Sequence, residues 1–170
     1  LTYGKNHCSF ASLPGMWERT IIASGFSKAY AMTGWRLGYL CAPKEICDAA
    51  LKIHQYAMMS APTASQFAAI EALKSGEEAK DEMVAEYRIR RNLFVKGLND
   101  IGLSCHLPQG AFYAFPKLDA ETVSAIVAND VIITPGLAFG SLGEGYARMS
   151  YAASQENIKE ALKRIQQVVE

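Results

Sequence analysis

The chain has 170 residues, enough for one ordinary domain or for pieces of two. Half of its residues are hydrophobic, and 17 Lys and Arg residues balance 17 Asp and Glu residues, so the formal net charge is zero. This balance gives no field that would attract nucleic acid or an anionic membrane surface. No apolar run approaches the ~18 residues that span a bilayer. We therefore expect a globular protein that binds neither nucleic acid nor a membrane.

The first half of the chain alternates strand and helix signals. After a loop over 1–17, apolar runs over 18–23 and 36–42 predict two buried strands. Proline is favoured at the start of a helix, so a helix is predicted from Pro43 to about 59 and another from Pro62 to about 76. Helical spacing predicts that each helix buries one apolar stripe, formed by Ile46, Ala49, Ala50 and Ile53, and then by Phe67, Ile70 and Leu73.

The second half begins with a long predicted helix over 77–100. Short strand-like runs follow, and a helix is predicted over 120–128. Ser154 is predicted to cap a final helix with an apolar stripe at Ile158, Leu162, Ile165 and Val169. The strand-like runs cover 103–107, 111–115, 131–133 and 146–152. The arginines of the long helix, which we interpret as a solvated basic face, are Arg88, Arg90 and Arg91.

This change in the pattern of predicted strands and helices predicts two domains, 1–95 and 96–170, with their boundary inside the long helix. Strand–helix alternation before the boundary is typical of an α/β domain, and the mixture after it is typical of a small α+β domain. The expected fold class is therefore α/β.

The cysteines and histidines carry no pattern of a disulfide framework or a metal site. The four cysteines form no Cys-x-x-Cys pair, and the three histidines are scattered without metal-ligand spacing. We expect buried, reduced thiols in a cytoplasmic protein. The cysteines are Cys8, Cys41, Cys47 and Cys105.

One segment, residues 24–39, organises the chain. Its sequence is Ser-Gly-Phe-Ser-Lys-Ala-Tyr-Ala-Met-Thr-Gly-Trp-Arg-Leu-Gly-Tyr, so Lys28 follows the first predicted strand and Arg36 comes shortly before the next. A lysine between two buried strands is costly unless its ammonium is paired or neutralised. An imine with an aldehyde cofactor removes that charge, and lysine is the side chain that does this chemistry.

This segment resembles the cofactor-lysine segment of the class I/II aminotransferases, which are fold-type-I pyridoxal 5′-phosphate (PLP) enzymes. Two distant stretches, Pro-Gln-Gly-Ala-Phe-Tyr at 108–113 and Arg-Met-Ser-Tyr-Ala at 148–152, fit the C-terminal half of such an enzyme in order and spacing. The resemblance covers essentially the whole chain. It implies the aspartate aminotransferase-like fold, with 1–95 ending the large PLP-binding domain and 96–170 forming the small C-terminal domain.

The resemblance also implies a role for each matching residue. Lys28 would form a Schiff base with PLP and, once freed by the substrate, would move the Cα proton. Arg36 would bind the cofactor phosphate with its paired donors, and Ser27 or Ser24 would add a hydroxyl. Arg148 would fix the substrate carboxylate in a bidentate pair.

Four further residues receive structural interpretations. Gly34 is expected to let the chain turn so that Arg36 reaches the cofactor. Gly38 is expected to allow another backbone or a ligand to approach closely. Tyr113 and Phe139 are interpreted as core or pocket wall, with no chemical role.

The implied function is the transfer of an amino group between an amino acid and a 2-oxo acid, in an enzyme that is a homodimer at full length. Two alternatives stay open: a PLP-dependent carbon–sulfur β-lyase, and an aminotransferase-like ligand-sensing domain of a transcription regulator. The family places a cofactor-ring aspartate and much of the substrate pocket upstream of Leu1. The 170-residue chain alone is therefore expected to be inactive.

Overall fold

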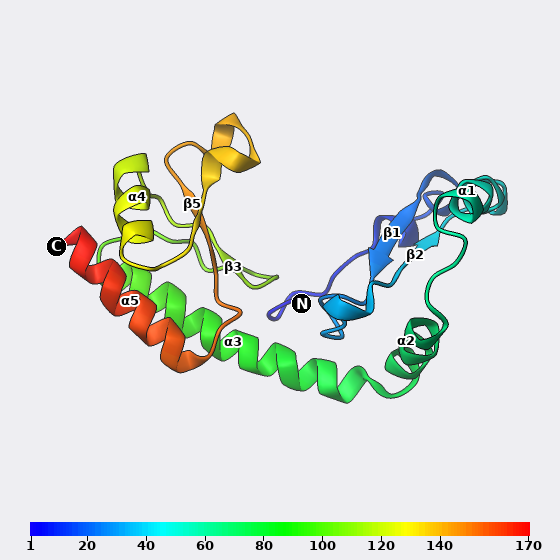
Figure 1. The fold of residues 1–170 in the computed structure, drawn as a ribbon, viewed down its shortest axis with the longest axis horizontal. Coiled ribbons are helices and arrows are strands. Elements are labelled where there is room, and N and C mark those ends of the chain that lie inside the picture. Colours follow the sequence, from blue (N-terminus) through cyan, green and yellow to red (C-terminus); the bar gives the residue numbers. More distant parts are fainter. The chain divides into compact units, whose positions relative to one another are not determined.

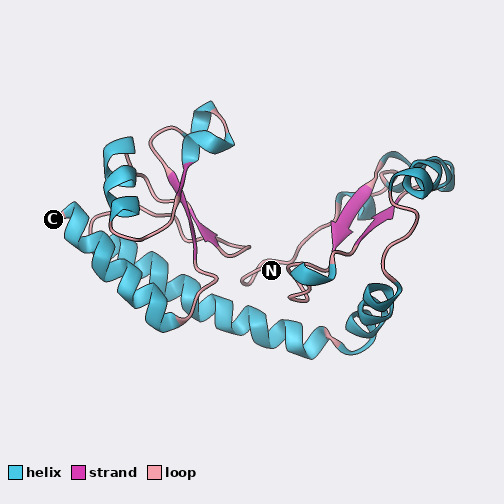
Figure 2. Cartoon of the chain, viewed as in Figure 1, coloured by secondary structure: helices cyan, strands magenta, loops and turns pink.

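The structure, a computed structural model, describes all residues from 1 to 170. Helices make up most of its regular structure and the strands are short (Figure 2). The chain divides into two compact units: unit 1 consists of residues 1–5 and 83–170, and unit 2 of residues 6–82. No helix has the length and the apolar composition that crossing a membrane requires.

Unit 2 contains a two-stranded antiparallel sheet (Figure 1). Strand β1 (Ile22–Gly25) pairs with strand β2 (Gly38–Cys41). A Cβ atom on Gly38 would lie 2.9 Å from the carbonyl oxygen of Ser24, so the expected close approach at this glycine is confirmed. The expected buried strand over 18–23 is wrong, because Trp17–Arg19 forms a short 3₁₀ helix, the strand begins later, and most residues of both strands are exposed.

The two helices of unit 2 begin where the prolines predict. Helix α1 (Lys44–Ala57) follows Pro43, and helix α2 (Thr63–Ser75) follows Pro62. These positions suit proline, whose missing N–H would have no partner within the helix.

The expected burial of the apolar stripes on α1 and α2 is wrong. Ile53, Phe67 and Leu73 are 72%, 69% and 66% exposed. Proline and helical spacing set a helix locally, whereas burial needs a partner surface. The buried apolar cluster of this unit is small and consists of Phe26, Met32 and Ala69.

Helix α3 (Glu77–Asp100) has the bounds that the sequence predicts, and it runs from unit 2 into unit 1. Gly76 separates it from α2, and the Gly76 amide donates to the carbonyl of Ala72 at 2.9 Å. Glu77 and Glu78 occupy its first turn, where acidic side chains complement the helix dipole. The division between the compact units falls inside this helix, and the domain boundary near residue 95 stays a prediction.

Unit 1 contains a three-stranded antiparallel sheet in the order β3–β5–β4. The central strand β5 (Ala147–Ser150) pairs with β3 (Tyr113–Ala114) on one side and with β4 (Thr134–Pro135) on the other. The expected strands over 103–107 and 131–133 are wrong. Neither segment pairs along a neighbouring strand, and pairing rather than apolar composition defines a strand.

The central strand alternates between the core and the opposite face of the sheet. Ala147, Met149 and Tyr151 are 0%, 2% and 0% exposed. Because side chains along a strand point to alternating faces, Arg148 and Ser150 lie on the other face.

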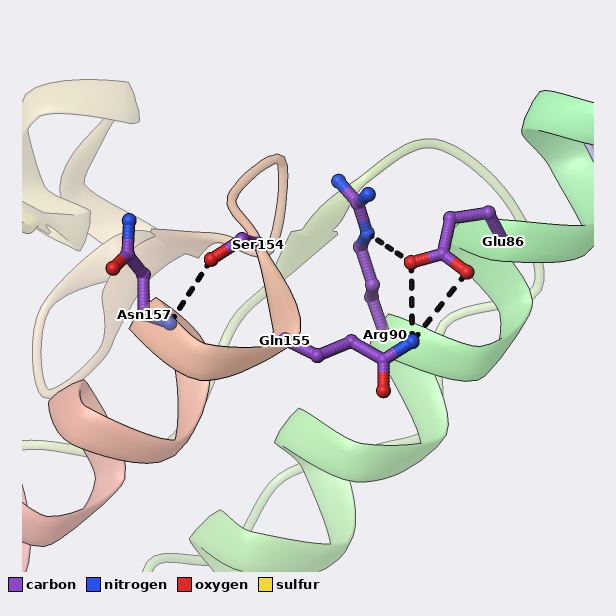
Figure 3. Close-up of polar contacts among 5 residues, drawn as sticks. All are labelled: Glu86, Arg90, Ser154, Gln155 and Asn157. Carbon is purple, nitrogen blue, oxygen red and sulfur yellow. Dashed lines mark hydrogen bonds and ion pairs between the residues drawn. The ribbon is translucent and has the colours of Figure 1, made fainter.

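Helices α4 (Ala120–Ala128) and α5 (Gln155–Val169) complete unit 1. The Ser154 hydroxyl accepts from the amide of Asn157 at 3.2 Å, which confirms the predicted cap (Figure 3). Figure 1 shows α5 alongside the C-terminal half of α3. A Cβ atom on Gly97 would collide with the side chain of Leu162, so this glycine lets the two helices approach closely.

A polar cluster also ties α3 to the start of α5 (Figure 3). Arg90 donates from Nε to Glu86 Oε1 at 2.7 Å, and Gln155 donates from Nε2 to the same oxygen at 3.2 Å. These hydrogen bonds, of which the one from Arg90 has the larger effect, lower the pKa of the Glu86 carboxyl.

The prediction of a solvated basic face on α3 is confirmed only for Arg88, which is exposed, and is wrong for Arg91, which is 7% exposed.

The core of unit 1 predicts that replacing isoleucine by alanine lowers the free energy of unfolding much more at Ile165 than at Ile132. Ile165 is fully buried in α5, so Ile165→Ala should lower the free energy of unfolding by about 2–5 kcal/mol. Ile132 is 93% exposed, and Ile132→Ala should change it by less than about 0.5 kcal/mol. Urea unfolding followed by circular dichroism measures both, and equal losses would contradict this core.

Candidate functional site

The three predicted cofactor-binding residues lie on one loop of unit 2, the lysine loop, residues 26–37, which joins β1 to β2. Ser27 and Lys28 lie in a turn directly after β1, and Arg36 lies just before β2. One connection therefore carries a hydroxyl, an amine and a guanidinium.

The backbone of the lysine loop is fixed by its own contacts around Phe26. The carbonyl of Phe26 accepts from the amide of Met32 at 3.4 Å, and both side chains are buried with Ala69 of α2. Ser65, also on α2, donates from its hydroxyl to the carbonyl of Trp35 at 2.7 Å. The helix thus supports the loop at both its start and its end.

Arg36 turns the chain back toward β2. Its φ of 52° and ψ of 46° are left-handed, a conformation that costs a residue with a Cβ about 1–2 kcal/mol. Its Nη1 donates to the carbonyl of Thr33 at 3.0 Å, and the Thr33 hydroxyl donates to the carbonyl of Ser27 at 3.0 Å. The expectation that Gly34 makes this turn is wrong, because Gly34 lies in a 3₁₀ helix, Thr33–Trp35, without a positive φ.

Lys28 and Arg36 are exposed, and Ser27 is half-buried. The expectation of a lysine enclosed by two buried strands is therefore wrong, since neither β1 nor β2 is buried. What the chain itself provides is a lysine accessible to solutes on a loop of fixed backbone.

The fourth predicted site residue, Arg148, lies on β5 in unit 1. Residues opposite each other in an antiparallel pair point to the same face. Tyr113 is opposite Ser150, and is therefore a diagonal neighbour of Arg148 on that face. Arg148 Cζ lies 4.6 Å from the centroid of the Tyr113 ring and 4.6 Å from that of Phe139.

Tyr113 and Phe139 are therefore contacts of Arg148 and not core residues. Tyr113 is half-buried and Phe139 is 52% exposed. Arg148 takes part in none of the ion pairs of the chain. The contacts of its guanidinium are with the two aromatic rings.

The two distant stretches, 108–113 and 148–152, lie side by side in unit 1. Tyr151 donates from its amide to the carbonyl of Phe112 at 3.0 Å and from its hydroxyl to the carbonyl of Ala111 at 3.1 Å. The hydroxyl of Tyr3 donates to the carbonyl of Ala111 as well. Two tyrosines thus hold one peptide group beside β3.

Arg91 supports the same loop from α3. It donates from Nη1 to the carbonyl of Pro108 at 2.9 Å, and its Cζ lies 4.5 Å from the centroid of the Tyr3 ring. The role of Arg91 was not predicted, but its sequence position carried a signal. It falls at helical spacing from Tyr87, Phe94 and Leu98, on the apolar side of α3.

Comparison with known proteins assigns the family. Residues 3–165 match the family described as aminotransferase class I and II. The chain belongs to this family. The resemblance inferred from the lysine loop and the two distant stretches is confirmed.

Relatives of known sequence within the aminotransferase family include YugH of Bacillus subtilis, whose aminotransferase name is itself provisional. YugH is 55% identical over 97% of this chain and 45% of its own length. The aromatic-amino-acid aminotransferase 2 of Thermococcus litoralis is 43% identical over 98% of this chain and 45% of its own length. The chain thus spans about half the length of these relatives.

Solved aminotransferase structures share the fold. An aromatic aminotransferase from Pyrococcus horikoshii superposes with a TM-score of 0.94 at 42% identity, over 98% of this chain and 47% of that one. A double mutant of the Thermus thermophilus aspartate aminotransferase superposes with a TM-score of 0.89 at 36% identity, over 99% of this chain and 45% of that one. The expected α/β, aspartate aminotransferase-like fold is confirmed.

Tyr3 and Tyr151, which both donate to the Ala111 carbonyl, predict how the free energy of unfolding depends on alkaline pH. Burial, the largest cause for each, raises the pKa of Tyr3 and Tyr151 above the usual value of 10.0. The native state then holds these protons more tightly than the unfolded chain. The free energy of unfolding should be at its full value below about pH 10 and should fall as the pH rises further.

Tyr151→Phe tests this dependence. It should cost about 1 kcal/mol at pH 8, through the lost hydrogen bond to Ala111, and should make the alkaline decline shallower. Tyr56→Phe, at a tyrosine that is 94% exposed, should decline like the wild type. Urea unfolding between pH 8 and 11 measures all three proteins, and an unchanged decline in Tyr151→Phe would refute the assignment.

Proposed function

We propose that this chain is the C-terminal part of a PLP-dependent aminotransferase that moves an amino group between an amino acid and a 2-oxo acid. The observation that carries this proposal is the lysine loop, which presents Ser27, Lys28 and Arg36 together. Family membership and relatives named as aspartate and aromatic-amino-acid aminotransferases support it. No observation favours the β-lyase or the transcription regulator.

The donors of the lysine loop fit PLP, which has an aldehyde and a phosphate. Lys28 would hold the aldehyde carbon through its amine, and Arg36 and Ser27 would bind the phosphate through charge-assisted and hydroxyl hydrogen bonds. When bound, PLP supplies the electron sink for chemistry at the substrate Cα. The exposure of Lys28 and Arg36 leaves both accessible to such a ligand.

The chain's own residues would then perform two tasks. The Lys28 amine, once released by the substrate, would accept the Cα proton and return it, first as general base and then as general acid. Arg148 would bind the α-carboxylate through two parallel N–H donors and so orient the Cα–H bond. The amino acid and the 2-oxo acid both carry this carboxylate, so one arginine would serve both.

The proposal extends to the protein of which this chain would be a part. We propose that 1–95 end the large PLP-binding domain, that 96–170 form the small domain, and that the full-length protein is a homodimer. Large exposed side chains of unit 2, among them Ile53, Phe67 and Leu73, support a covering surface from the rest of that protein. Four free cysteines support a reducing compartment, which we take to be the cytoplasm.

The assignment of Lys28 predicts a single labelled lysine. Borohydride makes the bond between a lysine nitrogen and the PLP aldehyde carbon irreversible, so peptide mass spectrometry of the reduced, PLP-loaded full-length protein should find the label on Lys28. Lys28→Arg should lose the label, whereas Lys52→Arg, at an exposed lysine of α1, should keep it. A label on another lysine in the wild type would end this assignment.

Alanine substitutions of Arg148 and Arg36 should have different effects, the first on substrate use and the second on cofactor retention. Arg148→Ala should lower kcat/KM roughly 30- to 1000-fold in both half-reactions, because a bidentate charged contact is lost, while PLP is retained. Arg36→Ala should release PLP on dialysis. Arg88→Ala, at an exposed arginine of α3, should do neither. Equal cofactor loss from Arg148→Ala and Arg36→Ala would contradict the division of roles.

A further inference from the structure

Two aromatic rings reach Arg148 from the two sides of the central strand. Tyr113 comes from β3, which lies on one side of β5. Phe139 ends the 3₁₀ helix η4 (Gly136–Phe139), which directly follows β4 on the other side. The two rings are far apart in sequence, and the sheet brings both to one guanidinium.

Each ring is held in place by further contacts. The Tyr113 ring packs at 4.7 Å on Phe112, which stacks at 5.6 Å on Tyr87 of α3. The Phe139 and Phe115 rings form an edge-to-face pair with their centroids 6.3 Å apart. Each of the two rings thus has an aromatic contact besides Arg148.

This geometry restrains a guanidinium without using its hydrogen-bond donors. A cation over a ring face is attracted by the ring's quadrupole. The N–H donors of arginine lie in the guanidinium plane and point outward from its edge. Contacts with two rings therefore limit the motion of the Arg148 guanidinium, and neither contact uses one of its N–H···O hydrogen bonds, so the donors remain able to form a bidentate pair.

We propose that Tyr113 and Phe139 are positioning residues that pre-orient Arg148 for the α-carboxylate of the amino acid and of the 2-oxo acid. The inference rests on the proposed function of Arg148. Without the rings, a long side chain would have to lose its rotational freedom each time a carboxylate binds, and this loss weakens binding.

Leucine substitutions remove each ring and keep an apolar side chain of similar size. In the PLP-loaded full-length protein, Tyr113→Leu and Phe139→Leu should each raise the KM of the amino acid and of the 2-oxo acid about 3- to 30-fold, with a smaller change in kcat. PLP retention should not change. Tyr113→Phe keeps the ring face and should behave like the wild type.

A second measurement does not depend on activity. In the ¹⁵N-labelled protein, the Nε–H signal of Arg148 should be shifted by the ring currents and should report a restrained side chain. Tyr113→Leu and Phe139→Leu should move this signal and lower its order parameter. Tyr56→Leu, a control at a tyrosine of α1 that is 94% exposed, should change neither the signal nor KM. An unchanged signal in both ring variants would overturn the inference.

A double-mutant cycle separates failure of the inference from failure of the proposed function. If the rings act through Arg148, adding Tyr113→Leu to Arg148→Ala should cause no further loss in kcat/KM. Fully additive losses would overturn the positioning role while leaving the role of Arg148 intact. If Arg148→Ala alone leaves substrate use unchanged, the proposed role of Arg148 fails, and the inference fails with it.

Discussion

The placement of the carboxylate-binding candidate depends on one constraint, the burial of a single face of β5. Ala147, Met149 and Tyr151 fill the core, and this forces Arg148 onto the opposite face. A slip of the strand by one residue would bury the guanidinium and expose Met149, an exchange that is costly in both directions. The register of β5 also fixes its neighbours, because β3 and β4 pair with it alone. The aromatic surroundings of Arg148 follow from the same register.

The carbonyl of Ala111 adds a second restraint on the same region. Ala111 has a φ of 60°, an uncommon conformation for a residue with a Cβ, and buried hydroxyls of Tyr3 and Tyr151 donate to its oxygen. Residues far apart in the chain thus hold one strained peptide group just before β3. Strain of this kind persists where the surrounding structure over-determines it. Here the surroundings include Arg91, whose guanidinium lies over the ring of Tyr3.

The sequence predicted the helices far better than the strands. The bounds of α3 and α4 and the Ser154 cap were correct, because helical spacing and capping are local signals. The strands β3 and β4 contain two residues each, and pairing with β5 rather than composition defines them. The residues of the candidate site stay predictions. Motifs indicated Lys28, Arg36 and Arg148, but only the sheet reveals that Tyr113 and Phe139 reach Arg148.

The lysine loop shows which surroundings of Lys28 the chain's own residues determine and which they do not. Its backbone is fixed locally, by the contacts of Phe26 and Met32 with α2 and by the left-handed turn at Arg36. Exclusion of water is a collective property, however, and requires surfaces on every side of the amine. Unit 2 has a small core and leaves Lys28 exposed, so its residues set the geometry of the lysine but not a dry environment around it. In a PLP enzyme, this environment must come from surfaces beyond the lysine loop, and the exposed apolar stripes of α1 and α2 are where unit 2 is able to pack against more protein.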